Sequence, residues 1–276
     1  LLVVSGGNEF KNGKPLQPRL YLNNQGTFIK DTLAFRNIQL NASIVTASDF
    51  DNDGDLDITI ASDQLPLTFG AIPNQYLFKN DGHGKFDEVT AELAPEFQKI
   101  GLVKDLLWKD LDNNGYEDLI ALGYWMPVSV FMNDGTNLKL QNNNGLGITN
   151  GWWNTIIADD FDNDGDIDLV CGNWGLNTKL KASKEKPLSL YSYDFDDNGT
   201  VDPIVTYFHK DKETPFASKD ELVKQLPYLN KEYLSYQNFA RASLNDLFTA
   251  AKLRKADKKQ VYELASCYFE NEGNGK

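Results

Sequence analysis

Asp49-Phe-Asp-Asn-Asp-Gly-Asp-Leu-Asp57 is a nine-residue stretch that recurs, with small changes, at four places in the chain. The other copies begin at Asp110, Asp160 and Asp194. All four keep Asp at positions 1, 3 and 9 and Gly at position 6, and position 5 is Asp or Asn. Oxygen ligands around a sharp glycine turn suit a hard cation, and a set of about six to eight oxygens is typical of Ca²⁺. The stretch therefore predicts up to four calcium sites.

The side chains at positions 1, 3, 5 and 9 and the backbone carbonyl at position 7 are the expected ligands of each site. In the first and third copies these residues are Asp49, Asp51, Asp53, Asp55 and Asp57, and Asp160, Asp162, Asp164, Asp166 and Asp168. In the second and fourth copies they are Asp110, Asp112, Asn114, Tyr116 and Asp118, and Asp194, Asp196, Asn198, Thr200 and Asp202. A solvated turn is the plainer interpretation of any one copy, because Asp and Gly are common turn residues. Four copies at the same point of a strand pattern favour metal binding, with weaker sites where position 5 is Asn.

Position 12 separates these loops from the EF-hand, which begins in the same way but needs a bidentate Glu there, between two helices. The residues at position 12 are Ile60, Ala121, Cys171 and Val205. None of these side chains binds calcium, so the EF-hand is excluded. The acid at position 9 instead opens a short apolar run in each copy, which predicts a β-strand.

Each loop is expected to join two strands, because apolar or alternating segments also lead into it. These segments are 43–48, 106–109, 155–158 and 188–193. A second element with Asn and Gly between strand-like runs predicts hairpins. It occurs at 21–28, 77–86, 130–136 and 268–276. The resulting unit of four antiparallel strands is the blade of a β-propeller, so the sequence predicts an all-β fold.

The spacing of the loops is uneven, since their first residues lie 61, 50 and 34 residues apart. The fourth loop follows the third too closely for a complete blade. It is either a turn between the third and fourth strands of one blade, or the blade begun at Thr155 lacks its outer strands. We favour a new blade that starts at Leu188, is interrupted by an insertion and resumes near Leu264.

The loops and hairpins resemble the FG-GAP or VCBS repeats of integrin α-subunit propellers, cartilage acidic protein and UnbV-type bacterial surface proteins. The resemblance rests on the D-x-[DN]-x-D-G-x-x-D loops and on the hairpins such as Asn80-Asp-Gly-His-Gly-Lys-Phe86, over about residues 1–208 and 265–276. The segment 218–247 looks like the helical insertion of UnbV-type members. The resemblance implies a calcium-containing extracellular recognition scaffold whose propeller has more blades than this chain supplies.

Three ranges follow for the domain organisation. Residues 1–208 are expected to form propeller blades, the first incomplete, residues 209–260 a helical insertion, and residues 261–276 a resumed strand and hairpin turn. Ser218-Lys-Asp-Glu221 is a capping box before an apolar run, and Pro227 ends that helix. Both ends of the chain fall within repeat units, so we expect it to be a piece of a longer polypeptide that supplies the remaining blades.

The formal charge of −13 is concentrated in the loops, which contain 18 of the 40 acidic residues and no Lys or Arg. The rest of the chain has 22 acidic against 27 basic residues, a balance of +5. Nucleic acid is therefore not an expected partner. No apolar stretch reaches the roughly 20 residues of a membrane span. The two cysteines, Cys171 and Cys267, cannot form a disulfide framework.

The order of the strands places the calcium loops and the Asn-x-Gly turns on one face of the blades. Candidate ligand-binding residues lie in the connections on the opposite face: Trp125, Trp152, Trp153, Asn173 and Trp174. Aromatic platforms with neighbouring amides suit a glycan or a protein ligand. Packing of these tryptophans between blades is the competing interpretation.

A non-catalytic scaffold is the preferred functional class, exported to the extracellular space or the bacterial outer-membrane surface, where calcium is available. A calcium-dependent polysaccharide lyase and a purely structural spacer of a larger surface protein remain the alternatives. A lyase needs a base near its substrate, and the two histidines, His83 and His209, have no evident catalytic partner.

Overall fold

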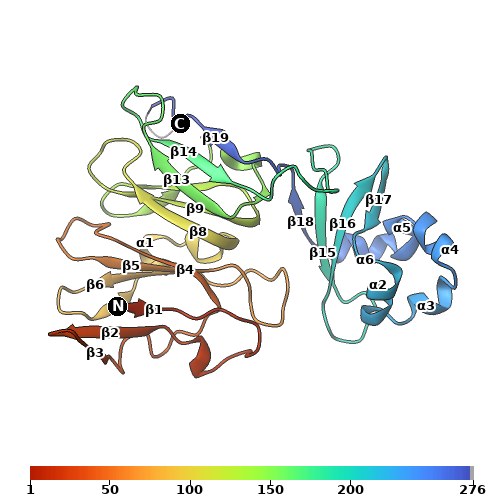
Figure 1. Cartoon of the computed structure of the whole chain (residues 1–276), viewed down its shortest axis with the longest axis horizontal. Helices are drawn as coiled ribbons and strands as arrows, with labels where there is room; N and C mark the ends of the chain where they lie inside the picture. Colours follow the sequence, from red (N-terminus) through yellow and green to blue (C-terminus); the bar gives the residue numbers. More distant parts are fainter. Residues whose placement is uncertain (274–276) are drawn as a thin grey trace. The chain divides into compact units, whose positions relative to one another are not determined.

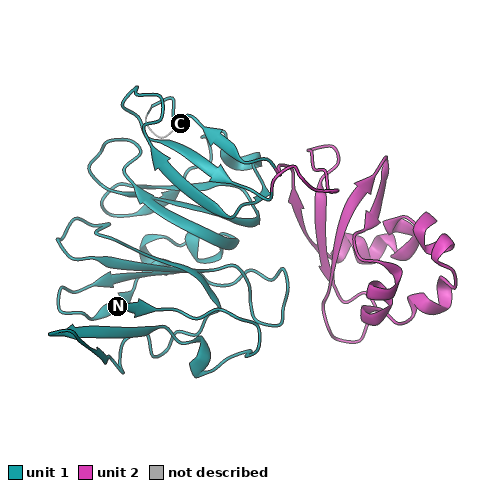
Figure 2. Cartoon of the chain, in the orientation of Figure 1, with its two compact units in different colours: residues 1–174, 265–276 teal, residues 175–264 magenta. Residues whose placement is uncertain are grey.

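A computed structural model of the chain describes residues 1–273, which form two compact units (Figures 1 and 2). The first unit comprises Leu1–Trp174 and the segment that starts at Ala265, and the second comprises Gly175–Leu264. The chain is mostly β, with several antiparallel sheets and few short helices. The predicted all-β class is confirmed. The last three residues of the predicted hairpin at 268–276 lie outside the described residues.

Four antiparallel sheets make up the first unit. The first sheet contains β1 (Leu2–Val3), β2 (Arg19–Asn24) and β3 (Thr27–Lys30). The second contains β4 (Ala42–Ser48), β5 (Asp57–Ser62), β6 (Tyr76–Asn80) and β7 (Phe86–Glu88). The third contains β8 (Leu102–Lys109), β9 (Asp118–Met126), β10 (Ser129–Asn133), β11 (Leu138–Leu140) and β12 (Gly151–Trp152). The fourth contains β13 (Thr155–Asp159), β14 (Asp168–Gly172) and β19 (Cys267–Phe269).

The connections of the first unit carry only short helical turns. They are η1 (Lys14–Leu16), α1 (Thr90–Leu93), η2 (Phe97–Lys99) and η3 (Leu146–Ile148). The second and third sheets each contain the predicted unit of four consecutive antiparallel strands, β4 to β7 and β8 to β11. The nine-residue loops join the first two strands of the second, third and fourth sheets. In every loop the residue before position 1 pairs across the sheet with the aspartate at position 9, as Ser48 pairs with Asp57.

Apolar side chains fill the space between successive sheets. Ile60 and Phe78 of the second sheet pack with Leu2 and Leu20 of the first. On the other side of the second sheet, Ala61 and Leu77 belong to a cluster with Trp108, Leu119 and Phe131 of the third. Ile120 and Val130 of the third sheet pack in turn with Ile156, Leu169 and Cys171 of the fourth. Burial of both faces explains why a strand such as β9 is apolar almost throughout.

The third strand of the fourth sheet comes from the end of the described chain. Strand β19 pairs with β14, with Cys171 opposite Cys267 and Leu169 opposite Phe269. The expectation that this segment resumes a blade begun at Leu188 is therefore wrong. Phe269 and Cys267 pack against the same apolar cluster as β14, so burial of these side chains favours the observed pairing. The sheet begun at Thr155 is thus completed by a strand that follows the second unit in the chain.

The second unit combines a sheet with short helices. Its strands, in the order β17-β16-β15-β18, are β15 (Leu188–Tyr193), β16 (Asp202–His209), β17 (Lys212–Pro215) and β18 (Asp257–Val261). Its helices are α2 (Lys219–Gln225), α3 (Leu229–Glu232), α4 (Tyr236–Arg241), α5 (Leu244–Leu247) and α6 (Ala250–Lys255). The predicted capping box is present, because Ser218 and Glu221 exchange hydrogen bonds at the start of α2. The helix ends two residues before Pro227, as expected.

The fourth loop connects β15 to β16 and so lies in this second unit. Tyr191, Phe195 and Ile204 around it share one apolar cluster with Leu222 and Phe248 of the helical segment. The second unit therefore includes the fourth loop and its strands, and it starts at Gly175. This boundary differs from the predicted ranges 1–208, 209–260 and 261–276. The strands at 188–208 look like blade strands in sequence, but they bury their apolar face against the helices. Among the described residues, no helix combines the length and apolarity needed to cross a membrane.

Candidate functional site

The four loops share one backbone conformation. Position 6 is glycine in each, with φ between 86° and 98°. Position 4 is also left-handed, with φ between 58° and 64°, at Asn52, Asn113, Asn163 and Asp197. Among residues with a side chain, Asn and Asp adopt this region most readily. The sequence interpretation explained the glycine but missed position 4, although the recurring Asn or Asp there was the available signal.

The aspartate at position 1 holds the loop in this conformation. Asp49 accepts hydrogen bonds from the backbone nitrogens of Asp53 and Gly54, each at 3.0 Å. The corresponding pair of bonds is present in all four loops at 2.7 to 3.2 Å. Each loop therefore places its first carboxylate in the same way relative to the turn.

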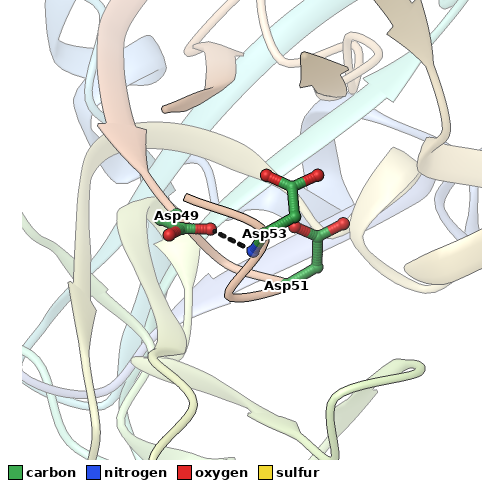
Figure 3. A group of neighbouring side chains, drawn as sticks. All are labelled: Asp49, Asp51 and Asp53. Carbon is green, nitrogen blue, oxygen red and sulfur yellow. Dashed lines mark hydrogen bonds between the residues drawn. The ribbon is translucent and has the colours of Figure 1, made fainter. Parts of the chain in front are cut away.

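Carboxylates converge at every loop. In the first and third loops the groups are Asp49, Asp51 and Asp53, and Asp160, Asp162 and Asp164; in the second and fourth they are Asp110, Asp112 and Asp118, and Asp194, Asp196 and Asp202. Within each group the potential ligand atoms lie within 4.8 Å of one another. Figure 3 shows the first group on its loop, with the bond from the Asp53 nitrogen to Asp49. The structure thus brings together the predicted side chains at positions 1 and 3 in all four loops.

Position 9 has a structural task that the sequence interpretation did not assign. Asp57, Asp118 and Asp168 each accept a hydrogen bond from a backbone nitrogen in the Asn-x-Gly hairpin, at 2.7 to 2.8 Å. Asp118 also accepts a bond from the Leu111 nitrogen at 2.9 Å, inside its own loop. The aspartate thereby ties loop and hairpin turn together. The prediction that the loops and the Asn-x-Gly turns lie together is confirmed for these three sheets.

At position 7 the predicted metal ligand is the backbone carbonyl rather than the side chain. This carbonyl belongs to Asp55, Tyr116, Asp166 or Thr200. In the first three loops the side chain at position 7 lies against the glycine of the hairpin turn: a Cβ added to Gly135 would come within 2.6 Å of the Tyr116 ring. Because Gly135 also has φ of +78°, glycine is required at this point of the turn.

The loops fit a bound cation, judged from the oxygen atoms that lack partners. Asp51 Oδ1, Asp57 Oδ2 and Asp196 Oδ1 are buried and accept no hydrogen bond in the described part of the chain. The pKa of Asp57 and of Asp118 is raised to about 6, chiefly by burial and also by neighbouring aspartates, with backbone hydrogen bonds acting in the opposite direction. Burial also raises the pKa of Asp202. Buried carboxylate oxygens without partners are costly unless a cation neutralises them, so the donor set suits a metal ion.

Lys79, on β6, is a residue of the first loop's site that sequence reasoning missed. Its ammonium group forms ion pairs with Asp51 and, at 3.3 Å, with Asp53. A positive charge thus lies beside two of the three grouped carboxylates. Lys79 follows the loop by more than 20 residues, and only the pairing of β6 with β5 brings it there.

A second set of missed residues consists of the asparagines that begin the hairpin turns. The Asn133 side chain donates to the carbonyl of Glu117 in its own loop at 3.0 Å and to the carbonyl of Phe50 in the preceding loop at 2.7 Å. Asn271 repeats this with Ile167 at 3.2 Å and Leu111 at 3.0 Å. These asparagines connect neighbouring sheets at the level of the loops. The recurrence of Asn before an acidic residue and Gly was the available signal.

The predicted ligand-binding tryptophans separate into two environments. Trp125, Trp152 and Trp174 form a chain of edge-to-face contacts, with ring centroids 5.2 and 5.4 Å apart. Exposure rises along the chain, from 7 % at Trp125 through half-buried Trp152 to 55 % at Trp174. Trp153 is fully buried among the apolar side chains between the third and fourth sheets, so its assignment to the ligand face was wrong.

Asn173 connects the backbone segments that carry the two more exposed rings, Trp152 and Trp174. Its side-chain oxygen accepts hydrogen bonds from the backbone nitrogens of Trp152 and Trp174, at 3.0 and 2.8 Å. The residues that sequence reasoning grouped therefore do lie together, with the exception of Trp153. We call Trp125, Trp152, Asn173 and Trp174 the tryptophan face.

The comparisons with known proteins support the repeat assignment for part of the chain. The family model of the FG-GAP-like repeat matches residues 110–171. The match begins at the first residue of the second loop and ends in β14, beyond the third loop. No match to a curated protein was found for the chain.

Proposed function

We propose that the four loops bind Ca²⁺ and that the chain forms part of a calcium-stabilised β-propeller of the integrin α-like or UnbV-type class. The observation that carries this proposal is the identical loop geometry at four places, with converging carboxylates in each. Only oxygen ligands are offered, which suits Ca²⁺ rather than zinc or copper. Three successive sheet interfaces, with loops and turns on one face, support the arrangement of neighbouring blades.

Calcium acts in this proposal as a structural ion. It neutralises carboxylates that the fold brings within 4.8 Å of one another and thereby removes their mutual repulsion. The aspartates at positions 1 and 9 already hold the backbone of the loop and the adjacent turn. Metal binding and rigidity of the loop face are therefore coupled through the same side chains.

Recognition of a glycan or a protein is assigned to the tryptophan face. The support is the exposed ring of Trp174, which packs on Trp152, itself in contact with Trp125, while the Trp174 backbone nitrogen bonds to Asn173. Exposed aromatic rings on a rigid support offer contact area with little loss of side-chain entropy. We propose binding rather than catalysis, because the clustered aspartates are committed to the loops. Millimolar calcium is an extracellular condition, so we place the protein outside the cell or on the bacterial outer surface.

The calcium proposal is tested by thermal unfolding of the protein in Ca²⁺, in Mg²⁺ and in chelator. A ligand at about 100 times its Kd stabilises the folded state by roughly 2.7 kcal/mol per site. We expect the melting temperature to rise in Ca²⁺, and Asp160→Asn to remove one site from the stoichiometry measured by calorimetry. Asp87→Asn, an exposed aspartate outside the loops, is the control. Equal melting temperatures in Ca²⁺ and in chelator would reject the proposal.

The recognition proposal is tested by screening an array of glycans and of extracellular proteins with wild type and with Trp174→Ala. The variant removes an exposed ring, so its melting temperature should not change while binding is lost. Phe10→Ala, with 54 % exposure, is the matched aromatic control. Unchanged binding by Trp174→Ala would refute the tryptophan face. The absence of any ligand would favour the structural spacer, and cleavage of a polysaccharide would favour the lyase.

A further inference from the structure

The second unit contains a cavity that the loops and the tryptophan face do not account for. It has a volume of about 440 Å³ and lies between the β16–β17 hairpin, the start of α2 and helix α4. This is a common size for a small-molecule site. Three basic side chains, His209, Lys212 and Lys219, line it, and the described lining includes no Asp or Glu.

Lys219 is the most informative of these residues. Only 9 % of it is exposed, and a lysine is seldom buried so deeply unless an acid pairs with it. Its ammonium group donates to the Asn230 side-chain oxygen at 3.2 Å and lies 5.2 Å from the centre of the Tyr236 ring. No carboxylate lies within ion-pair distance of it in the described part of the chain. An ammonium group carries three donors, so an anion in the cavity would find a desolvated positive charge.

The second lysine forms no ion pair with the described residues, although its charge helps to lower the pKa of Asp246 on helix α5. Lys212 donates to the backbone carbonyl of Arg241, and the described residues include no carboxylate in ion-pair contact with it. The two acids at the start of helix α2 are both hydrogen-bonded, since Asp220 accepts the Tyr236 hydroxyl at 3.0 Å and Glu221 accepts from Ser218 at 2.8 Å. The described lining itself thus contributes positive charge and no carboxylate, which favours an anion.

Aromatic rings surround the entrance. Phe216 is 59 % exposed and Tyr236 65 % exposed, and half-buried Phe239 also lines the cavity. Phe216 meets Tyr207 edge to face, with ring centroids 6.3 Å apart. Exposed rings beside a buried cation suit a ligand that has both an apolar face and a negative group.

We propose that this cavity binds a hexuronate, a pyranose ring that bears a carboxylate. The carboxylate pairs with Lys219 and Lys212 in charge-assisted hydrogen bonds, and the C–H face of the ring packs on Phe216 and Tyr236. The site lies wholly within Gly175–Leu264. Its described lining includes no residue of the four loops or of the tryptophan face, so it can be tested apart from the proposed function.

The experiment is a calorimetric titration of the full chain with glucuronate, and with glucose and benzoate as comparison ligands. We expect glucuronate to bind and glucose to bind at least about 10-fold more weakly, because a hydrogen bond to a charged group is worth roughly a factor of 10 to 100 in affinity. Lys219→Met should weaken glucuronate binding by a similar factor. Lys224→Met changes an exposed lysine of the same helix outside the cavity and should bind like wild type.

Two further variants keep the test decisive. Phe216→Ala removes an exposed ring, so it should fold normally and lose glucuronate affinity even if Lys219→Met proves unstable. Trp174→Ala should leave glucuronate binding unchanged, which separates this site from the tryptophan face. Equal affinity for glucose, binding of benzoate without glucuronate, or no binding of glucuronate at millimolar concentration would each overturn the proposal.

Discussion

Replacing Asn133 by alanine should destabilise the first unit more than its position at a hairpin turn suggests. Its side chain is 2 % exposed and makes three hydrogen bonds, to the carbonyls of Phe50 and Glu117 and from the nitrogen of Gly135, at 2.7 to 3.0 Å. The backbone bond from Asn133 to Asp118 does not involve the side chain, so it survives the substitution. The variant thus removes one bond to the loop of the neighbouring sheet, at Phe50, and two bonds within the loop and turn of its own sheet.

The magnitude follows from the buried partners that the substitution leaves behind. A typical internal hydrogen bond contributes about 1 kcal/mol, and more is lost where a buried partner stays unsatisfied, so three bonds correspond to roughly 3 kcal/mol. Domains of this kind are stable by about 5 to 15 kcal/mol. With a urea dependence of about 2 kcal/mol per molar, the unfolding midpoint should fall by roughly 1.5 M.

The assay is urea unfolding followed by circular dichroism, in chelator so that metal binding does not contribute. Asn143→Ala removes an exposed asparagine in the same sheet region and is the control. Asn133→Asp is a second variant, because a carboxylate keeps the size of the side chain but cannot donate. If Asn133→Asp unfolds at the wild-type midpoint, the donors to Phe50 and Glu117 do not hold the sheets together and the reasoning fails.

Three other predictions concern charge and reactivity. In chelator, Asp57 and Asp118 keep protons at pH values where the unfolded chain has lost them, because burial raises their pKa from 3.8 to about 6. The free energy of unfolding should therefore fall from pH 5 to pH 7. A higher value at pH 7 than at pH 5, measured by urea unfolding, would contradict this. Lys79→Met removes the ammonium group beside Asp51 and Asp53. Calcium affinity, measured by competition with a chromophoric chelator, should rise by roughly twofold to fivefold. Weaker calcium binding by the variant would show that Lys79 assists the metal. Cys171 is fully buried, and burial raises its pKa to about 12. Iodoacetamide should therefore modify half-buried Cys267 first in the native protein. Equal labelling of the two cysteines, measured by mass spectrometry, would argue against the burial of Cys171.

The loops and the strands beside them were predictable because their determinants are local. Glycine at position 6, acids at positions 1, 3 and 9 and an apolar run after position 9 fit into about a dozen residues, and all four copies have the expected strand pairing. The helix that begins at Lys219 was predictable for the same reason, since its capping box and the proline beyond it are close in sequence.

Features that depend on distant partners were not predictable. β14 pairs with β19 across almost 100 residues, and β19 alone has the pattern of any short strand. The position of Lys79 depends on the pairing of β6 with β5, and the burial of Trp153 depends on the packing of two sheets. A single sequence carries periodicity but not partner identity, which explains why the tryptophans were grouped correctly and only one was misplaced.

The excursion between β14 and β19 gives the molecule a modular design. The chain leaves the fourth sheet after Trp174 and returns at Ala265, and the Gly175 nitrogen bonds to the Leu264 carbonyl at 2.7 Å, so departure and return are adjacent. Whole domains are tolerated as insertions where both ends meet in this way. During evolution the segment 175–264 can therefore have been acquired, exchanged or lost as one cassette while the sheet kept its three strands. The same junction is a natural point for grafting a foreign domain onto the repeat scaffold.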